Sequence, residues 1–206
     1  MLHTTSTFKT ADGLTLYHEL RKPSNEPKAV IHFVHGMFEH TGRFTPTMEY
    51  LVKQGFAVCA YDQRGHGKSE GRRGDTPSYG HLIADLETFF NIGKEAYPDH
   101  KHFLFGHSMG GALVVNFALR KKPKIAGIIP SAPWFRIAMD VESWKQRFVH
   151  LLVKFWPTYT EQNQVSLSLL TRDKNEIEQY KTDSLMHTKI TARFFMEATA
   201  SGEWAI

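Results

Sequence analysis

The sequence predicts an α/β fold with a mostly parallel sheet, and two features of its hydrophobic pattern support this prediction. Over the first 133 residues, short apolar runs alternate with longer segments of helical spacing, which is typical of parallel strands joined by crossover helices. After that point only helical spacing continues. We therefore expect a core at residues 1–133 with helices on both faces of its sheet, followed by a helical cap at residues 134–206.

The expected elements follow one another with recognisable turns between them. A hairpin is expected around Ala11-Asp12-Gly13, because this turn sequence separates two strand-like runs. The further elements are strands at residues 29–34, 56–61, 103–105 and 125–130, and helices at residues 45–54, 79–96 and 112–120. We expect no strand in Trp134–Ile206.

One short apolar strand ends in Gly106-His107-Ser108-Met109-Gly110, and a helical run follows it. The pattern Gly-x-Ser-x-Gly between a strand and a helix marks a sharp turn that exposes the serine hydroxyl. Glycine is needed there because side chains at the first and last positions would collide with neighbouring backbone. Ser108 is therefore the candidate nucleophile, and the alternative is an ordinary helix N-cap.

A second motif lies at the end of another buried strand, where residues 30–34 run into His35-Gly36-Met37. An acyl-transfer site needs backbone N–H groups that hold the oxyanion of its tetrahedral intermediate. At a serine turn of this kind they come from the residue after the nucleophile and from a loop after an earlier strand. Met109 and Met37 are therefore the candidate oxyanion donors.

With these motifs the chain resembles the monoacylglycerol lipase and lysophospholipase branch of the α/β-hydrolases. Besides the serine turn, the resemblance is carried by Thr10-Ala11-Asp12-Gly13, by residues 35–43 and by residues 62–71. It implies the α/β-hydrolase fold with a helical cap, Ser108 as the nucleophile, Met37 and Met109 as oxyanion donors, and no cofactor. It also implies that Asp62–Ser69 shapes and braces the site without a catalytic role.

In such enzymes the catalytic triad follows the order Ser, acid, His along the chain, and the acid comes after a strand that follows the cap. No stretch before Ile206 has that pattern. We therefore expect the last strands of the core, with the acid and the His, to lie outside these residues. Residues 1–206 alone should be nearly inactive, because losing a triad member costs about 10⁴-fold in rate. The side chains considered and left without a role are His107, His150, His187, Asp140, Asp173 and Asp183.

The expected cap contains an amphipathic helix. Its apolar positions recur at helical spacing and lie among lysine and arginine residues. Two interpretations stay open: the apolar face packs on a core of its own, or it covers the site and faces lipid. The candidate lipid-facing residues are Trp144, Phe148, Leu151 and Phe155.

Composition excludes several classes of function. The net charge of +4 comes without a long basic run, so we expect no nucleic-acid partner. No segment reaches the roughly 18 apolar residues of a membrane span, and a single cysteine, Cys59, is expected to be a buried hydrophobe in a reducing compartment. We expect a cytoplasmic protein with peripheral membrane contact through the cap.

The histidines match no metal-binding motif, so no metal is expected. His100 and His102 are expected to face solvent at the start of a strand, and Arg72-Arg73 to form a solvated turn rather than an anion site.

The function that these observations favour is a serine esterase acting on a lipid monoester: monoacylglycerol first, lysophospholipid second. Ser108 would form an acyl-enzyme that water then hydrolyses. The alternative is a non-catalytic short form that binds lipid or a protein partner through its cap. The sequence carries no signal for acyl length, head group or oligomeric state.

Overall fold

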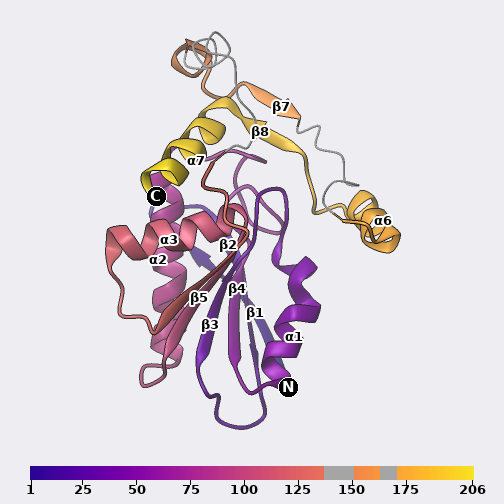
Figure 1. Cartoon of the computed structure of the whole chain (residues 1–206), viewed down its shortest axis with the longest axis vertical. Coiled ribbons are helices and arrows are strands. Elements are labelled where there is room, and N and C mark those ends of the chain that lie inside the picture. The colour runs from indigo at the N-terminus through magenta and orange to yellow at the C-terminus, as the bar shows by residue number, and fades with distance from the viewer. Residues whose placement is uncertain (137–150, 163–170) are drawn as a thin grey trace.

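A computed structural model describes residues 1–136, 151–162 and 171–206. Its strands are β1 (Leu2–Lys9), β2 (Thr15–Lys22), β3 (Val30–Val34), β4 (Ala57–Tyr61), β5 (His102–His107) and β6 (Gly127–Ser131). They form a six-stranded sheet in the order β1-β2-β4-β3-β5-β6 (Figure 1). The β1–β2 hairpin joins β4 in antiparallel fashion, whereas β4, β3, β5 and β6 run parallel. The predicted α/β architecture is confirmed.

Helices cover both faces of this sheet. They are α1 (Thr45–Lys53), preceded by the 3-10 helix η1 (Thr41–Phe44), α2 (Tyr79–Ala96) and α3 (Met109–Lys121). In Figure 1, α1 lies on one side of the strands, and α2 and α3 lie on the other. The helix α3 begins at Met109, earlier than the hydrophobic pattern predicted, because its first turn is made of Met109-Gly110-Gly111.

Alternation along the central strands sends their side chains into two cores. Phe33 of β3 and Val58 of β4 share one core with Met48 of α1. Cys59, the next residue of β4, points the other way and shares the larger core with Leu86 of α2. The expected burial of Cys59 is confirmed, and this burial raises the pKa of its thiol to about 12, so the thiol is not a nucleophile at neutral pH.

The expectation of no strand after residue 133 is wrong. Two short strands, β7 (Thr160–Gln162) and β8 (Lys189–Thr191), pair in antiparallel fashion with Thr160 opposite Thr191. The hydrophobic pattern could not reveal them, because each has three residues and the pair is mostly polar. Their partners also lie about thirty residues apart in the sequence.

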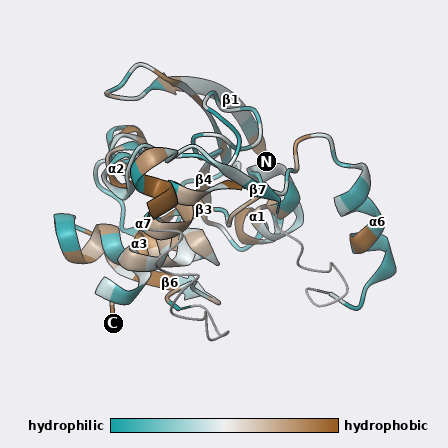
Figure 2. Cartoon of the chain, turned by 90° about the horizontal axis from the view of Figure 1, so that it is seen from above, coloured by the Kyte–Doolittle hydropathy of each residue, from teal (hydrophilic) through white to brown (hydrophobic). Residues whose placement is uncertain are grey.

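Two further helices flank this two-stranded ribbon. The helix α6 (Lys174–Thr182) has no buried residue and stands away from the sheet (Figure 2). The helix α7 (Ala192–Trp204) instead packs on α2 and α3, and its Phe194 and Ala198 belong to the larger core. Within the described ranges, no helix combines the length and the apolar composition that crossing a membrane requires.

The ribbon is fastened to the loop between β4 and α2 by backbone and side-chain contacts. Gly74 has a φ of +65°, and a Cβ on it would lie 1.7 Å from the carbonyl oxygen of Lys189. The Thr191 N–H donates to the Gly74 carbonyl at 2.9 Å. The buried Asp75 carboxylate accepts from the Thr191 hydroxyl and from Arg193 Nε, each at 2.7 Å. Burial raises the pKa of Asp75, but these bonds outweigh it and hold the pKa below its usual value.

A buried histidine pair links β3 to β5. His32 Nε2 lies 2.9 Å from His102 Nδ1, and His102 Nε2 lies 2.9 Å from the Tyr97 carbonyl oxygen. Because a carbonyl only accepts, His102 carries its proton on Nε2 and accepts from His32. Burial, and then the neighbouring His102, lower the pKa of His32 to about 3.

The expectation that His100 and His102 face solvent is therefore wrong. His102 is only 4% exposed, because the end of α2 folds over it at Tyr97. The His100 side chain is 18% exposed and lies 3.0 Å from Glu26.

The histidine pair predicts a loss of stability in acid. Between about pH 6.5, the unfolded value, and pH 3, the unfolded chain binds one more proton at His32 than the folded chain. The free energy of unfolding therefore falls as pH drops through this window, by about 1.4 kcal/mol per pH unit for this one group. In urea unfolding followed by circular dichroism, His32→Gln should make the pH dependence shallower by that amount. His81→Gln, at a partly exposed histidine of α2 that bonds to the Ser78 hydroxyl, is the control. Parallel curves for the wild type and His32→Gln would contradict the prediction.

Candidate active site

The serine turn predicted from the sequence is present between β5 and α3. Ser108 has φ 52° and ψ −117°, and such a positive φ is rare for a residue with a side chain. Its backbone is held from two sides: its N–H donates to the Ser131 carbonyl at 2.9 Å, and its carbonyl accepts from the N–H of Ala112 and of Trp134. The end of β6 and the first turn of α3 thus hold Ser108 in a strained conformation.

The two glycines of the motif are required by close backbone contacts. A Cβ on Gly106 would lie 2.2 Å from the Gly110 carbonyl oxygen. A Cβ on Gly110 would lie 2.4 Å from the carbonyl oxygens of both Val34 and His35. Contacts this short with backbone cannot be relieved by a side-chain rotation, so only glycine allows α3 to start against the end of β3.

The loop after β3 lies against Ser108. A Cβ on Gly36 would lie 3.2 Å from the Ser108 Cβ. Phe38 in the same loop has a φ of 70°, a strained value for a residue with a side chain. The N–H groups of Met37 and Met109 have no hydrogen-bond acceptor among the described residues. Both candidate donors therefore belong to segments that meet at Ser108, and Met109 lies at a helix N-terminus, which favours negative charge.

The described histidines around this turn are engaged elsewhere. His107 Nδ1 lies 3.4 Å from the Ser131 hydroxyl. His35 Nδ1 donates to the Gly36 carbonyl at 2.7 Å while its Nε2 accepts from the Gln63 N–H at 3.0 Å, and burial lowers its pKa. Across the described ranges, no imidazole or carboxylate hydrogen-bonds to the Ser108 hydroxyl.

Two residues of the segment before β8 reach the loop after β3, and the sequence did not reveal either contact. His40 Nε2 lies 2.8 Å from Asp183 Oδ2. Burial raises the pKa of Asp183, but its hydrogen bonds with His40 and the Leu185 N–H outweigh this and lower it. The His187 N–H donates to the Phe38 carbonyl at 3.4 Å. These contacts join residues more than a hundred positions apart, for which the sequence contains no local signal.

His187 lies in a cluster of neutral rings. Its ring centroid is 4.8 Å from that of His66, and the His66 ring is 5.4 Å from that of His35. Burial, and then the charge of Arg73, lower the pKa of His187 to about 4. Among the parts of the chain that the structure describes, no group of three or more His, Cys, Asp or Glu side chains is arranged to hold a metal ion.

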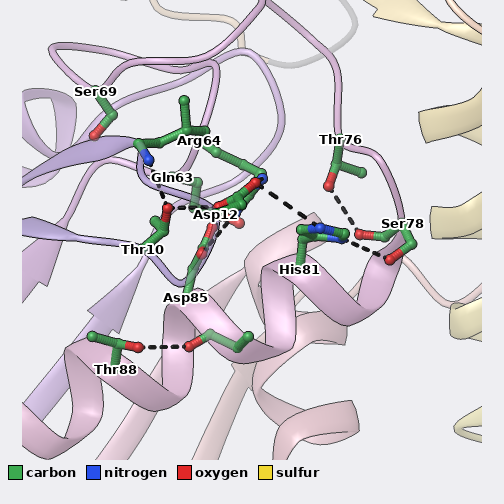
Figure 3. A network of polar contacts seen from close by, with 12 residues as sticks. Thr10, Asp12, Gln63, Arg64, Ser69, Thr76, Ser78, His81, Asp85 and Thr88 are labelled. Atoms are coloured by element: carbon green, nitrogen blue, oxygen red, sulfur yellow. Dashed lines mark hydrogen bonds and ion pairs between the residues drawn. The ribbon is translucent and has the colours of Figure 1, made fainter.

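The loop after β4 is anchored by a buried arginine (Figure 3). Arg64, 2% exposed, places its Nε and Nη2 on the Asp85 carboxylate of α2 at 2.6 and 2.8 Å. Its Nη1 and Nη2 also reach the Asp12 carboxylate of the β1–β2 turn at 2.9 and 3.0 Å. These bonds from Arg64 hold the pKa of Asp12 far below its usual value. A buried guanidinium between two carboxylates is the strong, geometrically specific form of ion pair.

Asp62, at the start of this loop, connects it to the loop after β3. Its Oδ1 accepts from the Thr41 N–H at 2.7 Å and its Oδ2 from the Lys68 N–H at 2.8 Å. Both oxygens are therefore used for backbone donors, and the side chain is fully buried. Asp62 therefore holds the loop after β3 and the loop after β4 together.

The candidate cap residues are only partly described. Leu151 and Phe155 are 56% and 75% exposed. Trp144, Phe148, Asp140 and His150 lie outside the described residues. Asp173 caps the N-terminus of α6 by accepting from the Asn175 N–H at 2.8 Å.

Comparison with known proteins places the chain in a family. The sequence profile of the family described as "Serine aminopeptidase, S33" matches residues 25–206, a range that includes the serine turn and the loop after β3. The chain belongs to this family. The monoglyceride lipase of Rattus norvegicus is 32% identical over 176 residues, and the match covers 85% of this chain and 58% of the rat protein.

Solved structures agree with this assignment. The monoacylglycerol lipase of Paleococcus ferrophilus has a TM-score of 0.77 at 29% identity, with 100% of this chain and 72% of that chain covered. A soluble variant of monoglyceride lipase from Saccharomyces cerevisiae, in complex with a substrate analog, has a TM-score of 0.84 at 25% identity, with 98% and 68% covered. The resemblance to monoacylglycerol lipases and the α/β-hydrolase fold are confirmed. The chain spans 58% of the length of its rat relative.

The glycine contacts at the turn yield a matched pair of substitutions. Gly110→Ala would place a methyl group 2.4 Å from two backbone carbonyl oxygens, so we expect the free energy of unfolding to fall by about 3 kcal/mol or more. Gly80→Ala, in the first turn of α2, meets only the Ser78 hydroxyl oxygen at 3.3 Å and should change stability by less than about 1 kcal/mol. Denaturant unfolding of both variants tests this, and equal stability would show that α3 does not depend on the glycine contact.

Proposed function

We propose that the protein is a serine esterase that hydrolyses a lipid monoester, monoacylglycerol first and lysophospholipid second, with Ser108 as its nucleophile. The observation that carries this proposal is the strained, positive-φ backbone of Ser108 between β5 and α3, together with its close contact with the loop after β3. A helix N-cap needs no such strain, because cap residues normally have extended backbone angles. The Ser108 side chain also accepts no capping hydrogen bond, which argues against the N-cap alternative.

In the proposed reaction, Ser108 Oγ attacks the ester carbonyl carbon and a tetrahedral intermediate forms. The N–H groups of Met37 and Met109 hold its oxyanion, each donor contributing about 3 kcal/mol to lowering the barrier. The alcohol then leaves with a proton, and water hydrolyses the acyl-enzyme. We place the base that activates Ser108 outside the described residues, since none of the described imidazoles contacts its hydroxyl.

The choice of an ester over an amide rests on the relatives. The family description names a peptidase, whereas the rat relative and the two solved structures are named as monoglyceride or monoacylglycerol lipases. These names apply to those proteins, and they support a lipid monoester as the substrate class for this one. Acyl transfer from esters and from amides uses the same serine and oxyanion donors, so only substrate assays distinguish the two.

Ser108 can be tested by covalent labelling. A fluorophosphonate probe should label the intact protein, and Ser108→Ala should abolish the labelling because the attacking oxygen is removed. Ser131→Ala is the control, since Ser131 holds the turn through its backbone carbonyl; it should still be labelled. Persistence of the label in Ser108→Ala, with peptide mapping to another residue, would place the nucleophile elsewhere.

We further propose that the cap contacts lipid through its exposed apolar side chains. Leu151 and Phe155 are more than half exposed, and Lys154 lies between them in the chain with its Nζ 5.8 Å from the Phe155 ring centroid. A basic residue beside exposed apolar groups is typical of a helix that lies in a membrane interface.

Removing both apolar side chains tests the contact with lipid. The double substitution Leu151→Ser and Phe155→Ser should weaken binding to phosphatidylcholine vesicles by about tenfold or more, since each buried side chain contributes roughly 1.5–3 kcal/mol. Turnover of a short soluble ester by the intact protein should stay unchanged. Tyr50→Ser with Leu119→Ser, two exposed residues outside the cap, is the matched control. Equal losses of binding and turnover would instead mean that the two side chains support the fold.

A further inference from the structure

A basic pocket lies between the loop that precedes α2 and the β7–β8 ribbon. Its volume is about 400 Å³, and its lining residues are Arg72, Arg73, Thr160, Gln162 and Lys189. Three of these five residues are cations, and none is a carboxylate. A pocket of this size accommodates a small-molecule group rather than a single ion.

The pocket has defined walls, because two elements far apart in the sequence are locked together beside it. Gly74 allows the Lys189 backbone to pass within a distance that excludes any Cβ. The hydrogen bond from Thr191 to Gly74 and the ion pair of Arg193 with Asp75 fix the same crossing. The backbone positions of Arg72, Arg73 and Lys189 around the pocket are thus set by the fold.

Among the described residues, no cation of the pocket forms an ion pair with a carboxylate, although Arg72 lies near enough to Asp75 to help lower the pKa of that carboxyl. Arg72 donates to the Thr158 carbonyl at 2.9 Å and to the Thr160 hydroxyl at 3.0 Å. Arg73 Nη2 donates to the Gly67 carbonyl at 2.7 Å, and its Nη1 is buried with no hydrogen-bond partner in the described parts of the chain. Lys189 forms no ion pair with any described residue.

Nearby acids are committed elsewhere. Asp75 is occupied by Arg193 and Thr191. Glu161 alternates onto the opposite face of β7 from Thr160 and Gln162, and it accepts from the Tyr159 hydroxyl at 3.0 Å. Three like charges around one pocket repel one another. A bound anion offsets this repulsion.

We propose that this pocket binds the phosphate group of an anionic ligand. Three cations favour an anion with more than one negative charge, and a phosphomonoester carries about 1.5 to 2 at pH 7. Guanidinium groups match phosphate oxygens in geometry, and a lysine adds a point charge. The group can belong to a free phosphomonoester or to the head group of an anionic lipid, and the chemistry of recognition is the same for both.

The proposal is independent of ester hydrolysis, because no lining residue belongs to the serine turn or to the oxyanion loop. It differs from the sequence-based expectation, which was a solvated turn at Arg72-Arg73 rather than an anion site. That expectation could not include Lys189, which reaches the pair only through the crossing at Gly74.

Calorimetric titration with glycerol 3-phosphate tests the site on the wild type and on Ser108→Ala. Saturable one-to-one binding is expected for both. Lys189→Gln and Arg72→Gln should each weaken it by at least about tenfold, as expected for the loss of a charge-assisted hydrogen bond. Lys181→Gln, on the exposed α6, removes the same charge outside the pocket and should leave binding unchanged. Absence of saturable binding to the wild type, or an equal loss in Lys181→Gln, would overturn the proposal.

The source of the phosphate is decided by a second pair of measurements. Vesicles of phosphatidylcholine alone are compared with vesicles of an equal mixture of phosphatidylcholine and phosphatidic acid. Binding to the mixed vesicles that Lys189→Gln removes, and Lys181→Gln does not, identifies a lipid head group. Lys189-dependent binding of glycerol 3-phosphate with no such difference on vesicles identifies a soluble phosphomonoester.

Discussion

At the end of β5, segments of bare backbone meet with no side chain between them, and the rest of the site depends on this contact. Gly110 rests on the carbonyls of Val34 and His35, while the Ser131 carbonyl holds the Ser108 N–H from the other side. Three adjacent parallel strands, β3, β5 and β6, must therefore end at the same level. Because the sheet order places β3 and β6 on either side of β5, contacts from β3, β6 and α3 can offset the backbone strain of Ser108.

A second constraint acts on the loops around this contact. Arg64 ties the loop after β4 to α2 and to the β1–β2 turn, and Asp62 ties it to the loop after β3. Within a low-dielectric interior, such fully bonded charges fix geometry more than they add stability. These bonds connect the loops at the carboxyl edge of the sheet to one another, including the loop after β3 that carries Gly36 and Met37.

The sequence was sufficient for features that depend on local pattern and insufficient for those that depend on distant contacts. The spacing of apolar residues located α2 with its observed ends, and the two glycines located the serine turn. The strands β7 and β8 were not predicted, because a strand of three mostly polar residues shows no hydrophobic periodicity. Burial of His102 depends on the chain reversal at Tyr97, and the basic pocket depends on Lys189 meeting Arg73 across more than a hundred residues. In both cases the sequence around one residue gives no indication of the other residue that it contacts.

The crossing at Gly74 has a consequence for how this architecture can diversify. Because the ribbon passes with no space for a Cβ and is secured by Asp75, the segment that covers the core cannot shift independently of the loop beneath it. Residues 72–76 and 189–193 therefore form one structural unit, although they are distant in the chain. A chimera that exchanges the segment after β6 between two relatives must transfer both stretches together. Otherwise the incoming segment would lack its matching contacts with the loop before α2.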